Sequence, residues 1–391
     1  MNEEQATALC IGLLKDGPLR SLSICHSNLC SVEPDLLAKA VAGLQVVELS
    51  QTSLTTLQVT VILSTIAQTE TLRLRSLHLS ESDLTTVEED TLVTAASRLD
   101  HLGLADRCLS PEAAGALLSA LDLCPRLRSV DLSYTDLSTL APSLLATTSK
   151  LTSLSLSGTC LRRHQATSLC SSLQQGSNLR SLQLSGNNLS LVEPELLACG
   201  LATLEEVAVY GCSLTTRQVN LLLGALLEDG GLRSLDLSCN NLSLVEPGLL
   251  ATASRELEEL RLSWSHLGVE QVTQIFLSLR RGSRLRSLDL SCNKLGLVTP
   301  GLLVTAVSQL EEVSLECCYL TEEQTGLLAS VRVAGLRSLH LVANGGGERS
   351  VGPVLLLSRE GEEEQQLVFD VQEARPDLQQ ILTLVSYCAN N

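Results

Sequence analysis

The stretch LRSLDLSCNNLSLVEPGLLA (232–251) decides the fold, because a near copy, LRSLDLSCNKLGLVTPGLLV (285–304), follows 53 residues later. Between the two copies lies a third leucine pattern, LEELRLSWSHL (257–267). Repetition at a fixed spacing is the signature of an architecture in which each repeat packs on its neighbours. The chain is therefore best aligned against itself before any motif is interpreted.

Aligning on L-x-x-L-x-L-x-x-x-x-L divides the chain into about 13 repeats, numbered here so that the first leucine is position one. They begin at Leu19, Leu44, Leu74, Leu99, Leu127, Leu151, Leu179, Leu204, Leu232, Leu257, Leu285, Leu310 and Leu336. Repeats of about 25 and about 28 residues alternate along the chain. The true period is therefore a pair of repeats.

Each repeat begins as a strand and continues as a helix. Leucines at positions one, four and six alternate with polar residues, which is the period of a strand with one buried face. Position nine holds a polar group that can bond backbone left unpaired at the turn. It is Asn187, Asn240, Asn293 or Asn344 in four coils, Cys212 or Cys318 in two, and Ser or Thr in most others. One strand, turn and helix make one coil of a solenoid. Arg107 holds position nine in the fourth coil, where we expect a local irregularity.

Two signals mark the helix starts. Short coils place a proline at the first helical position, where its missing N–H costs nothing: Pro34, Pro142, Pro194, Pro247 and Pro300. Long coils use a capping box: Thr55 to Gln58, Thr215 to Gln218 and Thr321 to Gln324. We call these the proline coils and the glutamine coils.

The predicted fold class is α/β, a curved solenoid. Parallel strands lie about 4.8 Å apart, whereas packed helices need about 8–10 Å. The array must therefore bend, with a parallel sheet on the concave face and helices on the convex face. The predicted organisation is an N-terminal partial repeat or capping helix (1–18), the repeats (19–344), and a C-terminal acidic segment and cap (345–391).

Composition narrows the function. The formal net charge is −17, from 44 acids against 27 bases, which argues against nucleic acid and membrane surfaces and favours a basic protein partner. No stretch is apolar for the ~18 residues of a membrane span, and the 14 cysteines are scattered as buried thiols would be. We expect a cytoplasmic protein.

Enzyme and metal chemistry find little support. No phosphate-loop, nucleophile-elbow or zinc-protease motif occurs, and GGGERS (345–350) lacks the lysine of a phosphate loop. His78 and His101 fall on outward positions of neighbouring strands, but a zinc site needs three or four ligands. We therefore expect no catalytic residue, no metal and no cofactor.

LRSLDLSCNNL and its relatives resemble leucine-rich repeats, and the alternation of 25 and 28 residues, with Asn and Cys sharing position nine, resembles the ribonuclease-inhibitor-like class. The resemblance covers residues 2 to about 344. It implies a horseshoe-shaped, cytoplasmic solenoid for protein–protein interaction. Two families share the class, ribonuclease inhibitors and the sensing regions of NOD-like receptors of innate immunity. The short 25-residue coils and the 2% aromatic content depart from the usual inhibitor pattern.

The outward strand positions are the expected recognition surface. Arginines at position two alternate with Glu205, Glu258 and Glu311 and predict a ladder of ion pairs. Unlike these, the acids at positions three and five are opposed mainly by Arg261: Glu206, Glu259, Glu312, Asp131, Asp236 and Asp289. Tyr134, Tyr210 and Trp264 take outward positions seven or eight, where no core requires an aromatic residue.

These residues predict a non-enzymatic module that binds a protein ligand through an acidic concave face. The ligand would be basic, and in the sharpest version a ribonuclease. Two alternatives stay open. The chain could be the ligand-sensing region of a NOD-like receptor, or a scaffold that associates with itself as a homodimer.

Overall fold

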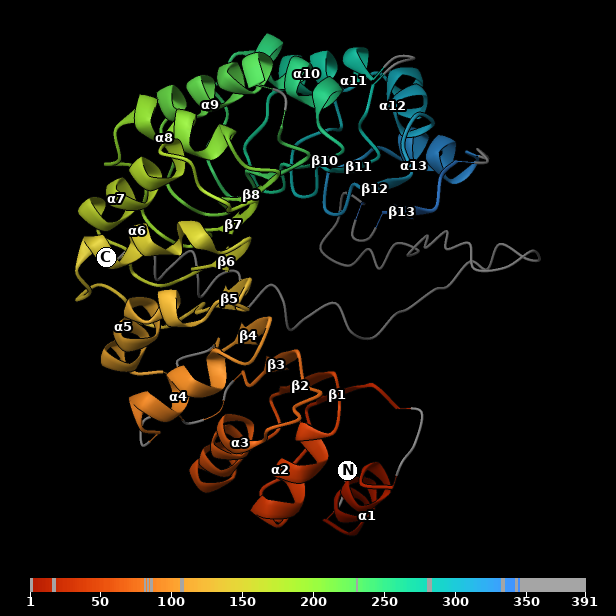
Figure 1. Cartoon of the computed structure of the whole chain (residues 1–391). Helices are drawn as coiled ribbons and strands as arrows, with labels where there is room; N and C mark the ends of the chain where they lie inside the picture. The colour runs from red at the N-terminus through yellow and green to blue at the C-terminus, as the bar shows by residue number, and fades with distance from the viewer. Residues whose placement is uncertain are drawn as a thin grey trace. The chain divides into compact units, whose positions relative to one another are not determined.

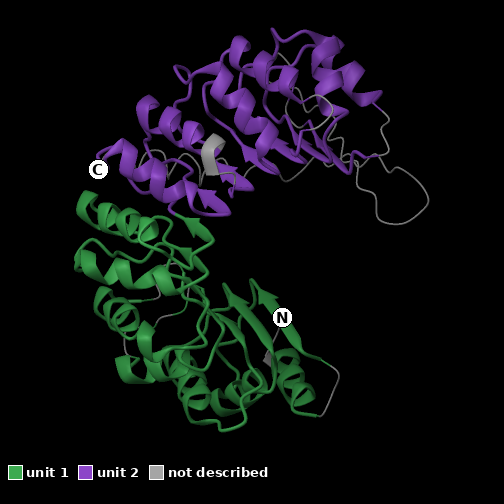
Figure 2. Cartoon of the chain, turned by 45° about the horizontal axis from the view of Figure 1, so that its top comes forward, with its two compact units in different colours: residues 1–183 green, residues 184–391 purple. Residues whose placement is uncertain are grey.

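A computed structural model of the chain describes residues 3–15, 19–80, 82, 84, 87–105, 109–229, 231–279, 283–331, 335–341 and 344. The chain forms two compact units, Met1–Gln183 (unit 1) and Leu184–Asn391 (unit 2), coloured separately in Figure 2. Arg107, the predicted irregularity, and residues 345–391, the predicted acidic segment and cap, lie outside the described residues. The predicted boundaries at residues 18 and 344 remain predictions.

Unit 1 contains the first seven strands, which pair in parallel in chain order. Their bounds are β1 Ser21–Cys25, β2 Val46–Ser50, β3 Ser76–His78, β4 His101–Gly103, β5 Ser129–Asp131, β6 Ser153–Ser155 and β7 Ser181–Gln183. The helices are α1 Glu3–Leu13, α2 Pro34–Ala42, α3 Thr56–Gln68, α4 Glu89–Ala96, α5 Pro111–Ser119, α6 Pro142–Ala146 and α7 Arg163–Gln174, with short 3-10 turns at Leu121–Leu123 and Thr147–Lys150.

Unit 2 repeats the arrangement with parallel strands β8 Glu206–Ala208, β9 Ser234–Asp236, β10 Glu259–Arg261, β11 Ser287–Asp289, β12 Glu312–Ser314 and β13 Ser338–His340. Its helices are α8 Pro194–Ala202, α9 Thr216–Asp229, α10 Pro247–Glu256, α11 Val269–Ser278, α12 Pro300–Val307 and α13 Glu322–Ala329. Within each unit the strands line one layer and the helices the other (Figure 1). The predicted α/β solenoid and its thirteen strands are confirmed among the described residues.

The core of each unit is a stack of leucines at matching positions. Leu235 of β9 lies in register with Val207 on one side and Leu260 on the other, and all three are buried. Leu237 lies two residues after Leu235 and is also fully buried. The predicted alternation of buried and outward residues is therefore confirmed, and apolar burial between successive coils is the main stabilising term.

Position nine forms the predicted ladder of backbone hydrogen bonds. The Nδ2 group of Asn240 donates to the carbonyl of Val209 in the preceding coil at 2.8 Å and to Leu237 at 3.0 Å. Its Oδ1 accepts from the N–H of Leu214 at 3.0 Å. Asn293 repeats this pattern, and the Sγ of Cys318 donates to the carbonyl of Leu290 at 3.2 Å. At Asn240, Asn293 and Cys318 the side chain thus bonds its coil to the coil before it, at the point where the strand ends.

The capping boxes connect coils as well as starting helices. Gln218 Oε1 accepts from the N–H of Thr215 at 2.8 Å, as predicted. Its Nε2 also donates to the carbonyls of Leu189 and Val192 in the preceding proline coil, both at 2.8 Å. Gln165 and Gln271, which the sequence analysis did not single out, do the same. A buried glutamine therefore joins each proline coil to the glutamine coil that follows it.

Position eight turns the chain off the strand in a left-handed conformation. Its φ is +64° at Gly158, +60° at Gly211, +62° at Tyr134 and +54° at Trp264. This conformation suits glycine and costs other residues energy. In this conformation the N–H at position eight donates a hydrogen bond to a backbone carbonyl of the next coil. An example is the N–H of Trp264, which donates to the carbonyl of Ser291 at 3.0 Å.

Candidate functional site

The outward residues of β8–β13 and their exits form a surface that we call the charged face. Strand register aligns its rows across neighbouring coils. The acids of the face are Glu205, Glu206, Asp236, Glu258, Glu259, Asp289, Glu311, Glu312 and Glu316, and its arginines are Arg233, Arg261, Arg286 and Arg337. Acidic groups therefore outnumber basic groups on this surface.

Arg261 lies between two aspartates in the position-five row. It is in register with Asp236 of β9 on one side and Asp289 of β11 on the other. Its Nη2 is 3.7 Å from Glu259 Oε2. Burial raises the pKa of the Asp236 carboxyl, although hydrogen bonds from Ser238 and the charge of Arg261 act in the opposite direction. One guanidinium thus serves several carboxylates, and one of them is held where ionisation is costly.

The predicted ion-pair ladder at position two is present around Glu311. Glu311 is 3.2 Å from Arg337 and 3.9 Å from Arg286, on the coils to either side. The two arginine side chains are well exposed, so each pair contributes about 0.2–1 kcal/mol at most. These pairs set register and solubility more than they hold a ligand.

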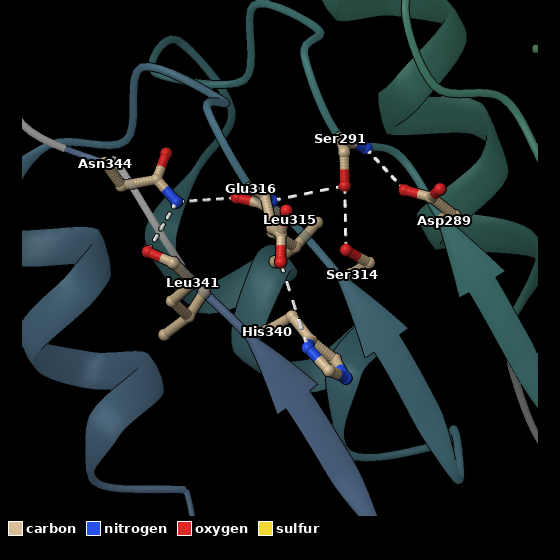
Figure 3. A network of polar contacts seen from close by, with 8 residues as sticks. All are labelled: Asp289, Ser291, Ser314, Leu315, Glu316, His340, Leu341 and Asn344. Atoms are coloured by element: carbon tan, nitrogen blue, oxygen red, sulfur yellow. Dashed lines mark hydrogen bonds and ion pairs between the residues drawn. The ribbon is translucent and has the colours of Figure 1, made fainter. Parts of the chain in front are cut away.

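A polar network links the last three coils (Figure 3). Asp289 Oδ1 accepts from the N–H of Ser291 at 2.8 Å, and the Ser291 and Ser314 hydroxyls lie 2.7 Å apart. Glu316 donates its N–H to Ser291 Oγ at 3.3 Å, and its carboxylate lies 3.8 Å from His340 Nδ1. Burial raises the pKa of the Glu316 carboxyl, although the charge of His340 acts in the opposite direction, and the charge of Asp289 makes a smaller contribution that raises it.

The exit edge of the strands carries an indole between two thiols. Trp264 holds position eight of its coil with 39% of its surface exposed, and Cys239 and Cys292 hold position eight on the coils to either side. One coil further, Cys317 is hydrogen-bonded to Cys292, and this bond lowers the pKa of the Cys317 thiol to about 7. The partly exposed Trp264 therefore has a small residue, cysteine, at the same position of the coil on either side.

Tyr210, the other predicted aromatic anchor of unit 2, is half-buried. Its carbonyl accepts from the N–H of Gly186 at 2.8 Å. Its side chain is hydrogen-bonded to Cys239, and this bond lowers the pKa of a thiol that burial raises. Part of the ring therefore has a structural role that the sequence analysis did not assign to it.

Two of the predicted site residues lie in unit 1. Asp131 ends β5 and accepts from the N–H and hydroxyl of Ser133 at 2.9 and 2.5 Å. Tyr134 is 41% exposed, and its ring lies against the surface of Gly158, where a Cβ atom would come within 2.6 Å of it. Their role in binding remains a prediction.

The other predicted residues share the charged face of unit 2: Tyr210, Trp264, Asp236, Asp289, Glu206, Glu259, Glu312 and Arg261. Glu316 and His340 also lie on the charged face and were not among the predicted residues. Position seven is serine in the three preceding coils, at Ser238, Ser263 and Ser291, so the departure to glutamate was a signal that the alignment contained. His78, the outward histidine of β3, lies over Gly103 of β4.

The repeated coil, its leucine stack and its position-nine ladder define a leucine-rich repeat protein. A leucine-rich repeat family model matches residues 178–199, 231–252 and 284–305, which are three of the proline coils. The alternating coils are similar to those of the ribonuclease-inhibitor-like class of these proteins.

The relatives are consistent with that class. The chain is 29% identical over 248 residues to a ribonuclease inhibitor of Sus scrofa, a match covering 59% of this chain and 54% of the inhibitor. It is 33% identical over 235 residues to NACHT, LRR and PYD domains-containing protein 14 of Mus musculus, covering 56% of this chain and 23% of that protein. The chain thus spans about half of the first relative and about a quarter of the second.

Among solved structures, the leucine-rich repeat-containing protein LegL7 from Legionella pneumophila is similar at a TM-score of 0.46 and 18% identity. The match covers 81% of this chain and all of that one. Within the described ranges, no helix is long and apolar enough to cross a membrane. Over the same ranges, no group of three or more His, Cys, Asp or Glu side chains could hold a metal ion.

Proposed function

We propose that the chain is a non-enzymatic binding module that holds a basic protein ligand on the charged face of unit 2. The observation that carries the proposal is the register of β9, β10 and β11, which places Arg261 between Asp236 and Asp289 with the exposed Trp264 at the exit edge of the same coil. Carboxylates in excess beside an open indole suit lysine and arginine side chains of a ligand.

The electrostatic part of the proposal follows from the surplus of acids. A surface of one sign attracts a ligand of the other sign and speeds the encounter, and this effect weakens as salt is added. Asp236 and Glu316 add a short-range contribution. Because burial raises the pKa of both carboxyls, an arriving cation stabilises the charged form that the free protein holds at a cost.

The apolar part of the proposal rests on Trp264. Tryptophan is enriched among residues that dominate binding energy, because it buries a large area with few rotatable bonds. A guanidinium or ammonium group over an indole face gains about 0.5–2 kcal/mol. The backbone of Trp264 is in the left-handed conformation, which sets the direction in which the side chain leaves the backbone.

The sharpest form of the proposal is a basic ribonuclease as the ligand, as the name of the Sus scrofa relative suggests. The test is an RNA cleavage assay in which a pancreatic-type ribonuclease is titrated with the protein. Inhibition at micromolar protein supports this form, and undiminished cleavage eliminates it. Association rates measured against salt test the wider proposal with the same ribonuclease and with a lysine-rich histone as basic probes.

A matched pair of variants locates the surface. The variant Trp264→Ala, Asp236→Asn and Asp289→Asn removes the indole and two charges from the charged face. The control, Leu123→Ala, Glu89→Gln and Glu112→Gln, removes an exposed apolar side chain and two exposed charges from the helices of unit 1. Loss of binding in the first variant alone supports the proposal, and equal binding by both moves the ligand off this face.

A second candidate is the ligand-sensing region of a NOD-like receptor, favoured by the 33% identity to the Mus musculus protein. A coding sequence that places a nucleotide-binding module before these repeats supports it. The remaining alternative, a self-associating scaffold, predicts a dimer by light scattering, and a monomer at high protein concentration contradicts it.

A further inference from the structure

Three leucines of unit 2 stand almost free on the surface. Leu191, Leu244 and Leu297 are 65%, 79% and 84% exposed, among the highest values of the described large apolar side chains. All three hold position thirteen of a proline coil, between the strand exit and the helix start. They lie 53 residues apart along the chain and therefore two coils apart in the stack. We call them the leucine row.

Each leucine is displayed on a rigid turn. The N–H of Val245 donates to the carbonyl of Leu242 at 2.9 Å, which places Leu244 third in a four-residue turn. The buried Gln271 of the next coil donates to the carbonyls of Leu242 and Val245, at 2.6 and 2.8 Å. Gln218 and Gln324 hold the turns of Leu191 and Leu297 in the same way. Because the turn is already ordered, binding a ligand here would have a small entropic cost from the backbone.

Folding does not require leucine at this position. In unit 1 the same turn, held by the same glutamine bonds, displays Ser31 and Thr139 instead. Both of these polar residues are exposed, as the leucines are. The turn thus forms equally with a polar side chain, and the leucines are a property of unit 2 alone.

The spacing of the leucine row matches one kind of partner. Leu242 N bonds to Ser265 O of the next coil at 3.0 Å, so the coils are still in direct backbone contact beside the row. Two coils therefore span roughly 10 Å, and seven residues of an α-helix rise about 10.5 Å. An α-helix with an apolar residue every seven positions presents anchors at the interval of the leucines.

The margins of the row indicate the charge of that helix. Glu193 and Glu246 lie two residues after Leu191 and Leu244. Glu270 lies at the start of α11, and all three glutamates are exposed. At the far end, Tyr319 is 70% exposed and its carbonyl is so close to Gly296 that a Cβ there would meet it at 2.5 Å. The exposed Tyr319 thus borders the leucine row beyond Leu297, and acids lie on the side nearer the helices.

We propose that the leucine row is a docking site for an amphipathic α-helix of a partner protein, with apolar residues at heptad spacing and lysine or arginine along one margin. The site is separate from the charged face, because it is built from the turns rather than from the strands. It does not depend on the ligand proposed for that face.

The test uses the full chain and two labelled peptides of 21 residues. The probe carries leucine at every seventh position and lysine along one margin, and the control peptide has the same composition with the leucines moved to every fifth position. Binding is measured by fluorescence anisotropy. The protein variant is Leu191→Thr, Leu244→Thr and Leu297→Thr, which copies the residue type found in unit 1, and its fold is checked by circular dichroism and its urea midpoint.

We expect saturable micromolar binding of the probe by the wild type, at least tenfold weaker binding by the threonine variant, and at least tenfold weaker binding of the control peptide. The Trp264→Ala, Asp236→Asn, Asp289→Asn variant binds the probe as the wild type does. No saturable binding, equal binding by the threonine variant, or loss of binding in the charged-face variant overturns the proposal. A wild-type dimer that the threonine substitutions dissociate also overturns it, because the occupant is then a second copy.

Discussion

Gln271 donates a hydrogen bond from its side-chain Nε2 to the carbonyl oxygen of Leu242, 29 residues earlier in the chain, at 2.6 Å. The same nitrogen reaches the carbonyl of Val245 at 2.8 Å, and the amide oxygen accepts from the N–H of Gly268, also at 2.8 Å. A single buried side chain therefore starts one helix and closes the turn of the preceding coil.

Replacing this amide with an apolar group of similar shape should be costly. Gln271→Met removes the bond to the carbonyl of Val245 and the bond from the N–H of Gly268, and it leaves the carbonyl of Leu242 with only the N–H of Val245. Each group left unsatisfied costs about 1–3 kcal/mol. We expect the free energy of unfolding, measured in urea, to fall by about 3 kcal/mol. The control is Gln309→Met, at an exposed glutamine in the same unit, which should change it by less than about 0.5 kcal/mol. Equal effects would contradict the role given to Gln271.

The position-nine ladder has one weak member. The hydroxyl of Thr135 is fully buried and is the only buried side-chain polar atom of the described residues without a hydrogen bond, whereas the equally buried Thr159 donates to Leu156 O at 2.7 Å. We expect Thr135→Val to raise the free energy of unfolding by about 1 kcal/mol, and Thr159→Val to lower it by a similar amount. Thermal and urea unfolding of the pair check the opposite signs, and a loss in both would show that the Thr135 hydroxyl is bonded in solution.

Two glycines at position eight should respond differently to alanine. Gly158 and Gly211 share a left-handed φ, so alanine strains both by about 1 kcal/mol. At Gly158 a Cβ would also lie 2.6 Å from the Tyr134 ring, whereas at Gly211 the nearest atom is 3.9 Å away. We expect Gly158→Ala to lower the free energy of unfolding by about 2–3 kcal/mol and Gly211→Ala by about 1. In the double variant Gly158→Ala with Tyr134→Ala, the excess loss at Gly158 should disappear.

Asp236 makes stability depend on pH in an unusual direction. Burial raises the pKa of its carboxyl in the folded protein, so the unfolded chain ionises first as pH rises. The contribution of Asp236 is complete below the ordinary aspartate pKa and is lost as pH rises through the folded value. Asp236→Asn should therefore gain stability over the wild type between acidic and neutral pH, while it loses affinity for a basic ligand. An unchanged difference across pH 3 to 7, measured by urea unfolding, would refute this reading of the carboxyl.

The fold could be predicted because the chain repeats, so that residues at the same position of successive coils are neighbours in space. Leucines at matching positions had to share a core, and the strand starts, proline helix starts and position-nine bonds all followed. The reach of Gln218 into the preceding coil could not be predicted, since a capping box looks the same whether or not its amide has a second partner. The left-handed position eight was equally hidden, because residues as different as Trp264 and Gly211 occupy it.

The candidate site was less accessible than the fold. The sequence indicated that Arg261 opposes the acids at positions three and five, and the strand register places it between Asp236 and Asp289. Whether a given acid is buried depends on its neighbours' side chains, so the raised pKa of Glu316 and its pairing with His340 came only from the structure. The leucine row was not predicted, because the sequence alone does not distinguish an exposed leucine from a buried one in a leucine-rich chain.

The bond from Gln218 back to the turn of Leu189 sets the smallest segment that the protein can gain or lose without damage. Removing one coil would bring two proline coils or two glutamine coils together and leave a buried amide or a turn unmatched. Removing residues 232–284 would instead deliver Asn293 to the place of Asn240 and keep every such contact. Gain or loss of 53 codons in the part of the gene that encodes unit 2 therefore conserves the contacts between its coils.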